Sequence, residues 1–218
     1  MGRRIEELWP LSGLRVRTGP LELRPPSDDD VAELAELTRE PIHDPATMPF
    51  FRSWTDEPEE RRVRSVLQWN WRARAEWSQE EWHLVLAVAH EGTLVGCQGI
   101  QSKQFAATKE VETGSWLGRR HQGQGIGTAM RRAVLHLAFA GLGAETARSG
   151  AFFDNPASQK VSERLGYERD GTEILPRRGE GAALVRYLMT RSTWEQRSQD
   201  WPAVTVEGLD GCRAEFGG

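Results

Sequence analysis

The stretch Gln122-Gly123-Gln124-Gly125-Ile126-Gly127 places three glycines two residues apart, between a strand-like segment and a long helical one. Glycine has no Cβ, so the backbone at these positions can approach a ligand closely. The first N–H groups of a helix lack partners inside the helix and favour negative charge. The sequence therefore predicts an anion-binding loop that suits a diphosphate, although a glycine-rich turn without a ligand has the same composition.

The residues after the loop separate it from two other glycine-rich motifs. A Walker loop ends in Gly-Lys-Ser/Thr, whereas this one continues as Gly127-Thr128-Ala129-Met130 without a lysine. In the dinucleotide-binding fingerprint the third glycine stands one position later than it does here. We therefore exclude a P-loop NTPase and disfavour a Rossmann-type site.

The segments around the loop predict a mixed sheet. Three strand-like segments precede it, the first two joined by a tight turn at Glu91-Gly92, and a helix and a further strand follow it. The expected ranges are strands at 82–90, 93–104 and 111–117, a helix at 126–141 and a strand at 146–153. A strand, a helix and a strand in that order imply a parallel crossover connection.

The N-terminal part predicts a strand at 21–24 and then a helix that starts with the capping box Ser27-x-x-Asp30. The segment 41–58 is rich in proline and large apolar residues, so we expect a loop that packs over the fold. A second helix is expected at 58–77.

The C-terminal part predicts a short helix from Asn155-Pro156 to Leu165, ended by Gly166, and a late strand at 182–190. Residues 203–206 are strand-like, and residues 208–218 are expected to form a loop.

Length and composition indicate one globular domain. The chain has 218 residues, of which 38% are hydrophobic and 28% charged, and no run of apolar residues is long enough to span a bilayer. We expect an N-terminal extension at 1–20, a catalytic domain at 21–194 and a C-terminal extension at 195–218. The N-terminus carries no secretory signal, so a cytoplasmic location is expected.

Charge and metal-binding residues narrow the function further. Two cysteines and five histidines without metal-ligand spacing predict no metal site. The net charge of −4 gives no footprint for nucleic acid, although Arg119-Arg120 and Arg131-Arg132 form a positive collar around the glycine loop. Each arginine pair could equally well lie on a solvent-exposed face and bind no ligand.

The loop resembles the diphosphate loop of GNAT acyltransferases, Gln/Arg-x-x-Gly-x-Gly/Ala, with Gln122, Gly125 and Gly127 in the defining places. The order of elements from about 21 to 190 resembles the same family. A second motif supports the resemblance, because Asn155-x-x-Ser158 followed by Gly166-Tyr167 is similar to the segment after the fifth GNAT strand. The resemblance implies an α/β fold with a mostly antiparallel sheet, splayed fourth and fifth strands and flanking helices.

The resemblance also implies a cofactor site, with acetyl-CoA or succinyl-CoA as co-substrate and no metal. The pantetheine arm would pair with the backbone between the splayed strands, the loop would hold the diphosphate, and Asn155 would contact the arm or the thioester. The residues implied in this site are Trp116, Leu117, Gly118, Gln122, Gly123, Gln124, Gly125, Ile126, Gly127, Thr128, Asn155 and Ser158. Asn155 has an alternative role as a helix cap.

The chemistry requires an acid for the leaving thiolate and a neutral amine. Many GNAT members place a tyrosine acid where this chain has Ser162. The resemblance to Rim-type acetyltransferases therefore points to Ser158, which could otherwise be a capping residue. Glu112 is the best-placed base along the chain, with His43 or Asp44 second, but each could be a surface charge, and a water relay could replace a dedicated base.

These observations predict an acyl-CoA-dependent N-acyltransferase of a Rim-like branch, resembling an actinobacterial subgroup with succinyl-CoA-binding members. The acceptor is an amine on a protein or a small molecule, and His43, Asp44 and Arg52 of the loop are expected to bind substrate. We expect no nucleic acid or membrane partner, and self-association is left open. The alternatives are a protein that binds acyl-CoA without transfer and a structural subunit of an assembly.

Overall fold

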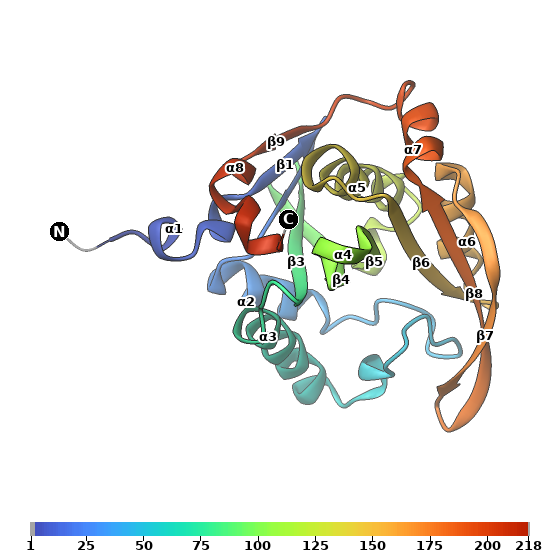
Figure 1. The fold of residues 1–218 in the computed structure, drawn as a ribbon. Coiled ribbons are helices and arrows are strands. Elements are labelled where there is room, and N and C mark those ends of the chain that lie inside the picture. The colour runs from blue at the N-terminus through green and yellow to red at the C-terminus, as the bar shows by residue number, and fades with distance from the viewer. Residues whose placement is uncertain (1–2, 218) are drawn as a thin grey trace.

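The computed structural model describes residues 3–217 and contains one nine-stranded sheet with the strand order β7-β8-β6-β5-β4-β3-β2-β1-β9 (Figure 1). Neighbouring strands pair antiparallel except for β5 and β6. The strands are β1 Arg15–Thr18, β2 Leu21–Arg24, β3 Glu81–His90, β4 Thr93–Lys103, β5 Glu110–Leu117, β6 Thr146–Phe152, β7 Glu168–Arg177, β8 Glu180–Thr190 and β9 Thr205–Glu207. The predicted mixed, mostly antiparallel sheet is confirmed.

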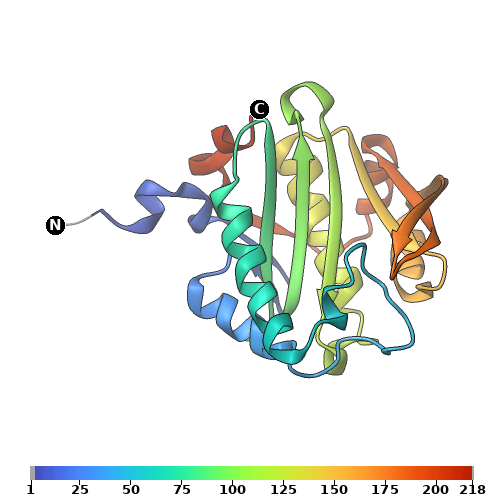
Figure 2. The ribbon, with the colours of Figure 1, turned by 90° about the horizontal axis from the view of Figure 1, so that it is seen from below.

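Helices cover both faces of the sheet, with α3 in front of the central strands and α5 behind them in Figure 2. The helices are α1 Ile5–Leu8, α2 Asp28–Leu37, α3 Glu59–Ala75, α4 Phe105–Thr108, α5 Ile126–His136, α6 Pro156–Leu165, α7 Arg191–Ser198 and α8 Leu209–Cys212. The predicted capping box at the start of α2 is present, with Asp30 N–H donating to Ser27 Oγ at 3.1 Å and Ser27 N–H to Asp30 Oδ2 at 2.9 Å. A smaller apolar cluster lies between the sheet and α2–α3, and the larger one lies under α5.

The predicted parallel crossover runs from β5 through α5 to β6, and the two strands pair only at their beginnings. The parallel register covers Glu110–Thr146, Val111–Ala147 and Glu112–Arg148 and then stops. β5 continues to Leu117 along β4, and β6 continues to Phe152 along β8. The predicted splay of the two central strands is therefore present and opens directly after the Glu112–Arg148 pair.

The first and last strands of the chain meet at one edge of the sheet, where β9 pairs with β1. The segment after β9 forms helical turns at Leu209–Cys212 and Arg213–Phe216, so the expected loop over 208–218 is wrong for the described residues. Phe216 is fully buried and packs on Trp77 and Trp82, and the indole N–H of Trp82 donates to the Phe216 carbonyl at 3.3 Å. An aromatic anchor thus orders a segment whose glycines and charges predict a loop.

Candidate active site

β5 and β6 separate after the Glu112–Arg148 pair, and we call the space between them the splay and the side nearest this pair its closed end. Hydroxyl groups line this closed end. Thr113, the first β5 residue past the paired region, donates from Oγ1 to the Arg148 carbonyl at 3.2 Å. The Tyr167 hydroxyl lies 3.4 Å from the same Thr113 oxygen and is buried. Side-chain contacts therefore replace backbone pairing where the strands begin to separate.

The glycine loop stands at the open end of the splay and leads into α5. Gly123 and Gly125 have φ values of +73° and +82°, and a Cβ added at either would meet nothing within 4 Å. Within residues 3–217, the N–H groups from Gly123 to Gly127 donate to no acceptor. Ile126 and Thr128 are buried and hold the first turn against the core. The loop thus presents a run of free backbone donors over open space, the arrangement that an oxyanion ligand requires.

The free edge of β5 is the second part of the site. The Gly118 N–H donates to the Val95 carbonyl at 2.9 Å, which fixes the alternation of the ladder between β4 and β5. Backbone groups of Trp116 and Gly118 therefore face β4, whereas those of Ser115 and Leu117 face the opening toward β6. An extended ligand arm can pair with this edge as a strand would.

Arg131 of α5 contacts both splayed strands from the face of the sheet that α5 covers. Its Nη1 donates to Ser149 Oγ of β6 at 2.9 Å, and its Nη2 lies 3.4 Å from Ser115 Oγ of β5. The residue is only 4% exposed, its Nε has no partner, and no carboxylate of the described chain pairs with it. The predicted positive collar is therefore uneven, because Arg131 lies inside the fold while Arg132 packs over the Trp201 ring at 5.6 Å.

The proline-rich loop covers the other side of the splay. Trp54 packs on Trp116 of β5 with ring centroids 6.1 Å apart, and Phe51 packs on Phe152 of β6 at 5.8 Å. The loop starts beside the glycine loop, since Gln122 Nε2 donates to the Ile42 carbonyl at 2.7 Å and to the Leu117 carbonyl at 2.9 Å. The expectation that this segment packs over the fold is confirmed, and it rests on both splayed strands.

Arginines of the β7–β8 turn fix the far side of this loop. Arg177 donates to the Met48 carbonyl at 2.8 Å, and Arg178 pairs with Asp56 at 2.6 Å. The Arg178 guanidinium lowers the pKa of the Asp56 carboxyl. The loop is thus tied to the sheet at both ends.

The residues of the second motif lie at the start of α6. Asn155 Oδ1 accepts the Ser158 N–H at 3.2 Å, so Asn155 caps the helix as its alternative role requires. Ser158 is half-buried, and its hydroxyl has no partner within the described chain. Ser162 is fully buried and its hydroxyl is unpartnered too, which places it in the core.

The predicted base and part of the predicted substrate-binding set lie in one open groove of about 720 Å³ between α3, the beginnings of β3 and β5, and the end of β4. Glu112 and Arg52 both line this groove, and Glu112 Oε2 accepts the Gln101 amide N–H at 2.9 Å. His43 and Asp44 bond within their own loop instead. His43 Nε2 lies 2.7 Å from Thr55 Oγ1, and Asp44 accepts the Ala46 N–H at 2.9 Å.

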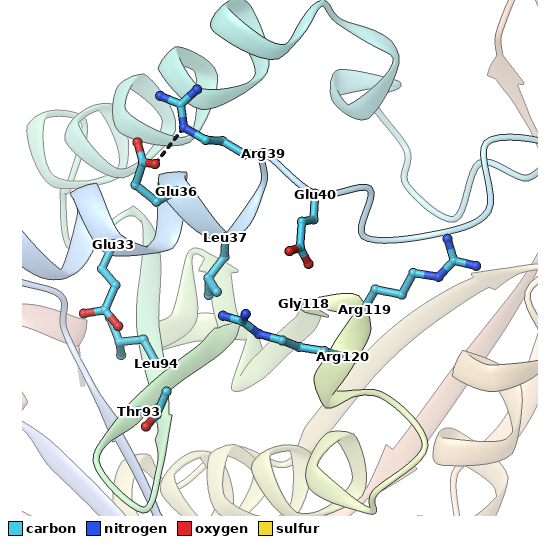
Figure 3. Close-up of a pocket in the computed structure, with 10 residues that line it drawn as sticks. All are labelled: Glu33, Glu36, Leu37, Arg39, Glu40, Thr93, Leu94, Gly118, Arg119 and Arg120. Atoms are coloured by element: carbon cyan, nitrogen blue, oxygen red, sulfur yellow. Dashed lines mark hydrogen bonds and ion pairs between the residues drawn. The ribbon is translucent and has the colours of Figure 1, made fainter.

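A smaller depression of about 340 Å³ borders the end of β5 on the α2 side (Figure 3). Arg120 extends toward Leu37 across it, while Glu40 and the Arg39–Glu36 ion pair stand at its rim. It carries charges of both signs and does not favour one class of ligand.

The structure adds Thr113, Ser115 and Ser149 to the residues singled out in the sequence. It also gives positions at the splay to Arg131 and Tyr167, which the sequence marked only as part of a charged pair and of a motif. The adjacent arginines at 131 and 132 indicated positive charge near the loop. Which of the two is buried depends on the register of α5 against β5, which the sequence does not specify. Within residues 3–217 no helix is long and apolar enough to cross a membrane. The same residues contain no group of three or more His, Cys, Asp or Glu side chains that could hold a metal ion.

Comparison with known proteins agrees with this geometry. The sequence model of the acetyltransferase (GNAT) domain matches residues 20–168. RimJ of Mycobacterium smegmatis, solved with CoA-disulfide, is similar in fold, with 22% identity over 88% of this chain and 94% of that chain and a TM-score of 0.71.

Two further solved structures share the fold. A GCN5-related N-acetyltransferase from Brucella melitensis has 17% identity over 85% of this chain and 82% of that chain, with a TM-score of 0.69. RimL, a ribosomal L7/L12 alpha-N-protein acetyltransferase in complex with coenzyme A, has 18% identity over 81% and 97%, with a TM-score of 0.66. Because the family model covers well over half of the sequence, the chain belongs to the GNAT acetyltransferase family.

Proposed function

We propose that this protein is an acyl-CoA-dependent N-acyltransferase of the Rim-like type, with its catalytic domain at 21–194. One observation carries the proposal: free backbone donors of the glycine loop stand at the open end of a splay between two parallel strands. A diphosphate at the loop and an extended arm along the free edge of β5 would occupy both features at once. The similarity in fold to RimJ and RimL supports the Rim-like assignment.

In this proposal Gln122 to Thr128 hold the diphosphate, and the backbone groups of Ser115 and Leu117, which face the opening, form the strand edge that meets pantetheine. Trp116 and Gly118, which the resemblance also implied, pair with β4 instead. Transfer begins when the amine nitrogen attacks the thioester carbonyl, and N–H groups at the edge of β5 stabilise the oxyanion. Asn155 fixes the start of α6, so that the Ser158 hydroxyl, which has no partner among residues 3–217, serves as the acid. Glu112, at the last paired position of β5, accepts the amine proton directly or through water.

The acyl donor is acetyl-CoA or succinyl-CoA, and the loop from Ile42 to Asp56 would distinguish them. A succinyl carboxylate needs a cation or several donors when it leaves water. Arg52 and Glu112 line the same groove, and His43 and Asp44 belong to the loop that carries Arg52. Replacing Arg52 and His43 with alanine should then lower kcat/KM for succinyl-CoA far more than for acetyl-CoA, and equal losses would show that the loop does not bind the acyl carboxylate.

Thioester consumption tests the function. Acetyl-CoA and succinyl-CoA are each incubated with a panel of peptides with free N-termini, lysine peptides and small amines, and release of free thiol is followed. Turnover with one class of acceptor is the expected result. Tight stoichiometric binding of acyl-CoA without turnover on any acceptor would favour the alternative of a non-catalytic acyl-CoA-binding protein.

Two substitutions test the proposed acid and base. Ser158→Ala should lower kcat about 10- to 10⁴-fold with little change in acyl-CoA affinity. Glu112→Gln removes the proposed proton acceptor and should lower kcat with little change in acyl-CoA affinity. A normal kcat in Ser158→Ala would assign the acid role to another group.

A further inference from the structure

Among the residues that the structure describes, no carboxylate pairs with the guanidinium of Arg131, a buried cation that lies between the two splayed strands. It is 4% exposed, and its two observed partners are the neutral hydroxyls of Ser149 and Ser115. Its Nε is buried and has no acceptor in the described part of the chain. A buried charge without an opposite charge is unfavourable, so an interior cation of this kind is well suited to an anion that enters or develops beside it.

The register of α5 against β5 places this cation inward from the diphosphate loop. A Cβ on Gly127 would lie 3.8 Å from Leu117 Cδ1, so the start of α5 lies under the end of β5. Arg131 follows one helical turn later, and Ser115 lies about 7 Å closer to the closed end than Leu117. A pantetheine arm that runs inward from the loop carries its sulfur toward this level.

Ser115 and Ser149 connect the guanidinium of Arg131 to the space between the strands by hydrogen bonds. Each serine oxygen accepts a hydrogen bond from the guanidinium, and within the described chain neither O–H donates to a recorded acceptor. A hydroxyl whose oxygen accepts from a cation is a stronger donor, because hydrogen bonds in a chain polarise one another. Ser115 and Ser149 stand on opposite strands of the splay, so both O–H groups can donate to one atom between them.

We propose that Arg131, acting through the hydroxyls of Ser115 and Ser149, stabilises the thiolate of CoA as it leaves. This inference rests on the proposed function. The amine nitrogen forms a bond to the carbonyl carbon, the C–S bond breaks with its electron pair on sulfur, and the amine proton passes to a base or water. Arg131 is thus a positioning residue whose charge lowers the energy of the sulfur anion before any proton reaches it.

Other charged groups on the surrounding elements are engaged elsewhere. Their contacts are Glu112 with Gln101, Arg148 with Glu110 and Asp170, Glu163 with Arg169 and with the Tyr187 hydroxyl, His136 with Trp194, and Arg132 with Trp201. Tyr167 reaches the closed end through its contact with Thr113, and its hydroxyl has a proton to donate. It is therefore the rival proton donor that the test must separate from Arg131.

The test compares calorimetric binding of CoA with that of desulfo-CoA, in which hydrogen replaces the thiol, from about pH 6 to pH 9.5. A site that stabilises the thiolate binds CoA increasingly better than desulfo-CoA as pH rises past the pKa of the bound thiol. In the wild-type protein we expect this preference to reach about 10- to 100-fold, the value of one hydrogen bond to a charged group. Arg131→Met should reduce the ratio to about one at every pH, and Arg131→Lys should keep part of it.

Arg132→Met is the matched control, because it removes the neighbouring arginine of the same helix, and it should leave the ratio unchanged. If Arg131→Met fails to fold, Ser115→Ala and Ser149→Ala test the same relay and should each lower the ratio. Equal binding of both ligands by the wild-type protein at all pH values would overturn the inference and leave CoA binding intact. Loss of the preference in Tyr167→Phe but not in Arg131→Met would overturn it in favour of a tyrosine acid. If neither ligand binds, the proposed function itself fails.

Discussion

A single substitution in the glycine loop, Gly125→Glu, separates the cost of backbone strain from the loss of the ligand site. Gly125 has a φ of +82° and caps the start of α5. A side chain in this conformation costs about 1–2 kcal/mol of folding free energy. A Cβ there would meet nothing within 4 Å, so the variant is expected to fold.

The effect on binding is expected to be larger than the effect on folding. The glutamate fills the space in front of the free N–H groups and places a negative charge where a diphosphate would lie. Loss of two charge-assisted hydrogen bonds at about 1.5–3 kcal/mol each corresponds to roughly 10²- to 10⁴-fold weaker binding of CoA. Isothermal titration calorimetry with CoA, beside urea unfolding of the same sample, measures the two effects separately.

Gly143→Glu is the matched control, since Gly143 has a φ of +79°, open space around its Cβ position and a place beyond the other end of the same helical segment. It should lose a similar amount of stability and bind CoA like the wild type. Unchanged CoA affinity in a folded Gly125→Glu protein would refute the assignment of the loop. Equal loss of affinity in both variants would show that general strain, and not the loop, controls binding.

Three further predictions concern stability and reactivity. Burial lowers the pKa of His83 from 6.5 to about 4, so the unfolded chain takes up its proton first and stability should fall as pH drops from about 6.5 toward 4. Between pH 7 and pH 4.5, the free energy of unfolding measured with urea should fall by roughly 2 kcal/mol less in His83→Gln than in the wild type, and identical losses would contradict this. Burial raises the pKa of Cys97 to about 12 and that of Cys212 to about 11, so alkylation near neutral pH should be slow for the folded protein and fast in denaturant, and rapid labelling of the folded protein would refute this. Ser27→Ala removes one half of the capping box and should lower the free energy of unfolding by about 1 kcal/mol, with no change meaning that the cap contributes nothing.

Local patterns in the sequence were sufficient for most elements of the fold. The segment 82–104 carries apolar, β-branched residues on both sides of a Glu91-Gly92 turn, and β3 and β4 form there within a residue or two of the predicted ends. The helix after Asn155-Pro156 begins and ends where its cap and Gly166 indicate. In these places local conformational preference and tertiary packing favour the same structure.

The elements that were not predicted depend on distant parts of the chain. β7, from Glu168 to Arg177, carries mostly polar residues, because it is an edge strand that pairs with β8 alone. The buried position of Arg131 depends on its register against β5 and β6 and has no local signature. The loop motif was recognisable because its glycines are needed for their own backbone geometry, whereas the polar groups at the closed end of the splay come from separate strands.

The docking of the C-terminal segment also has a consequence for synthesis of the protein on the ribosome. Trp82 and its acceptor, the carbonyl of Phe216, are 134 residues apart in sequence. At roughly 5–20 residues per second, the nascent chain carries the uncovered tryptophan surface for about 7–27 seconds before Phe216 has been translated. During that interval β1 also lacks its outer partner, β9. Chaperone demand should therefore be highest late in translation, and a stalled or truncated nascent chain should aggregate through this edge even though its CoA loop is complete.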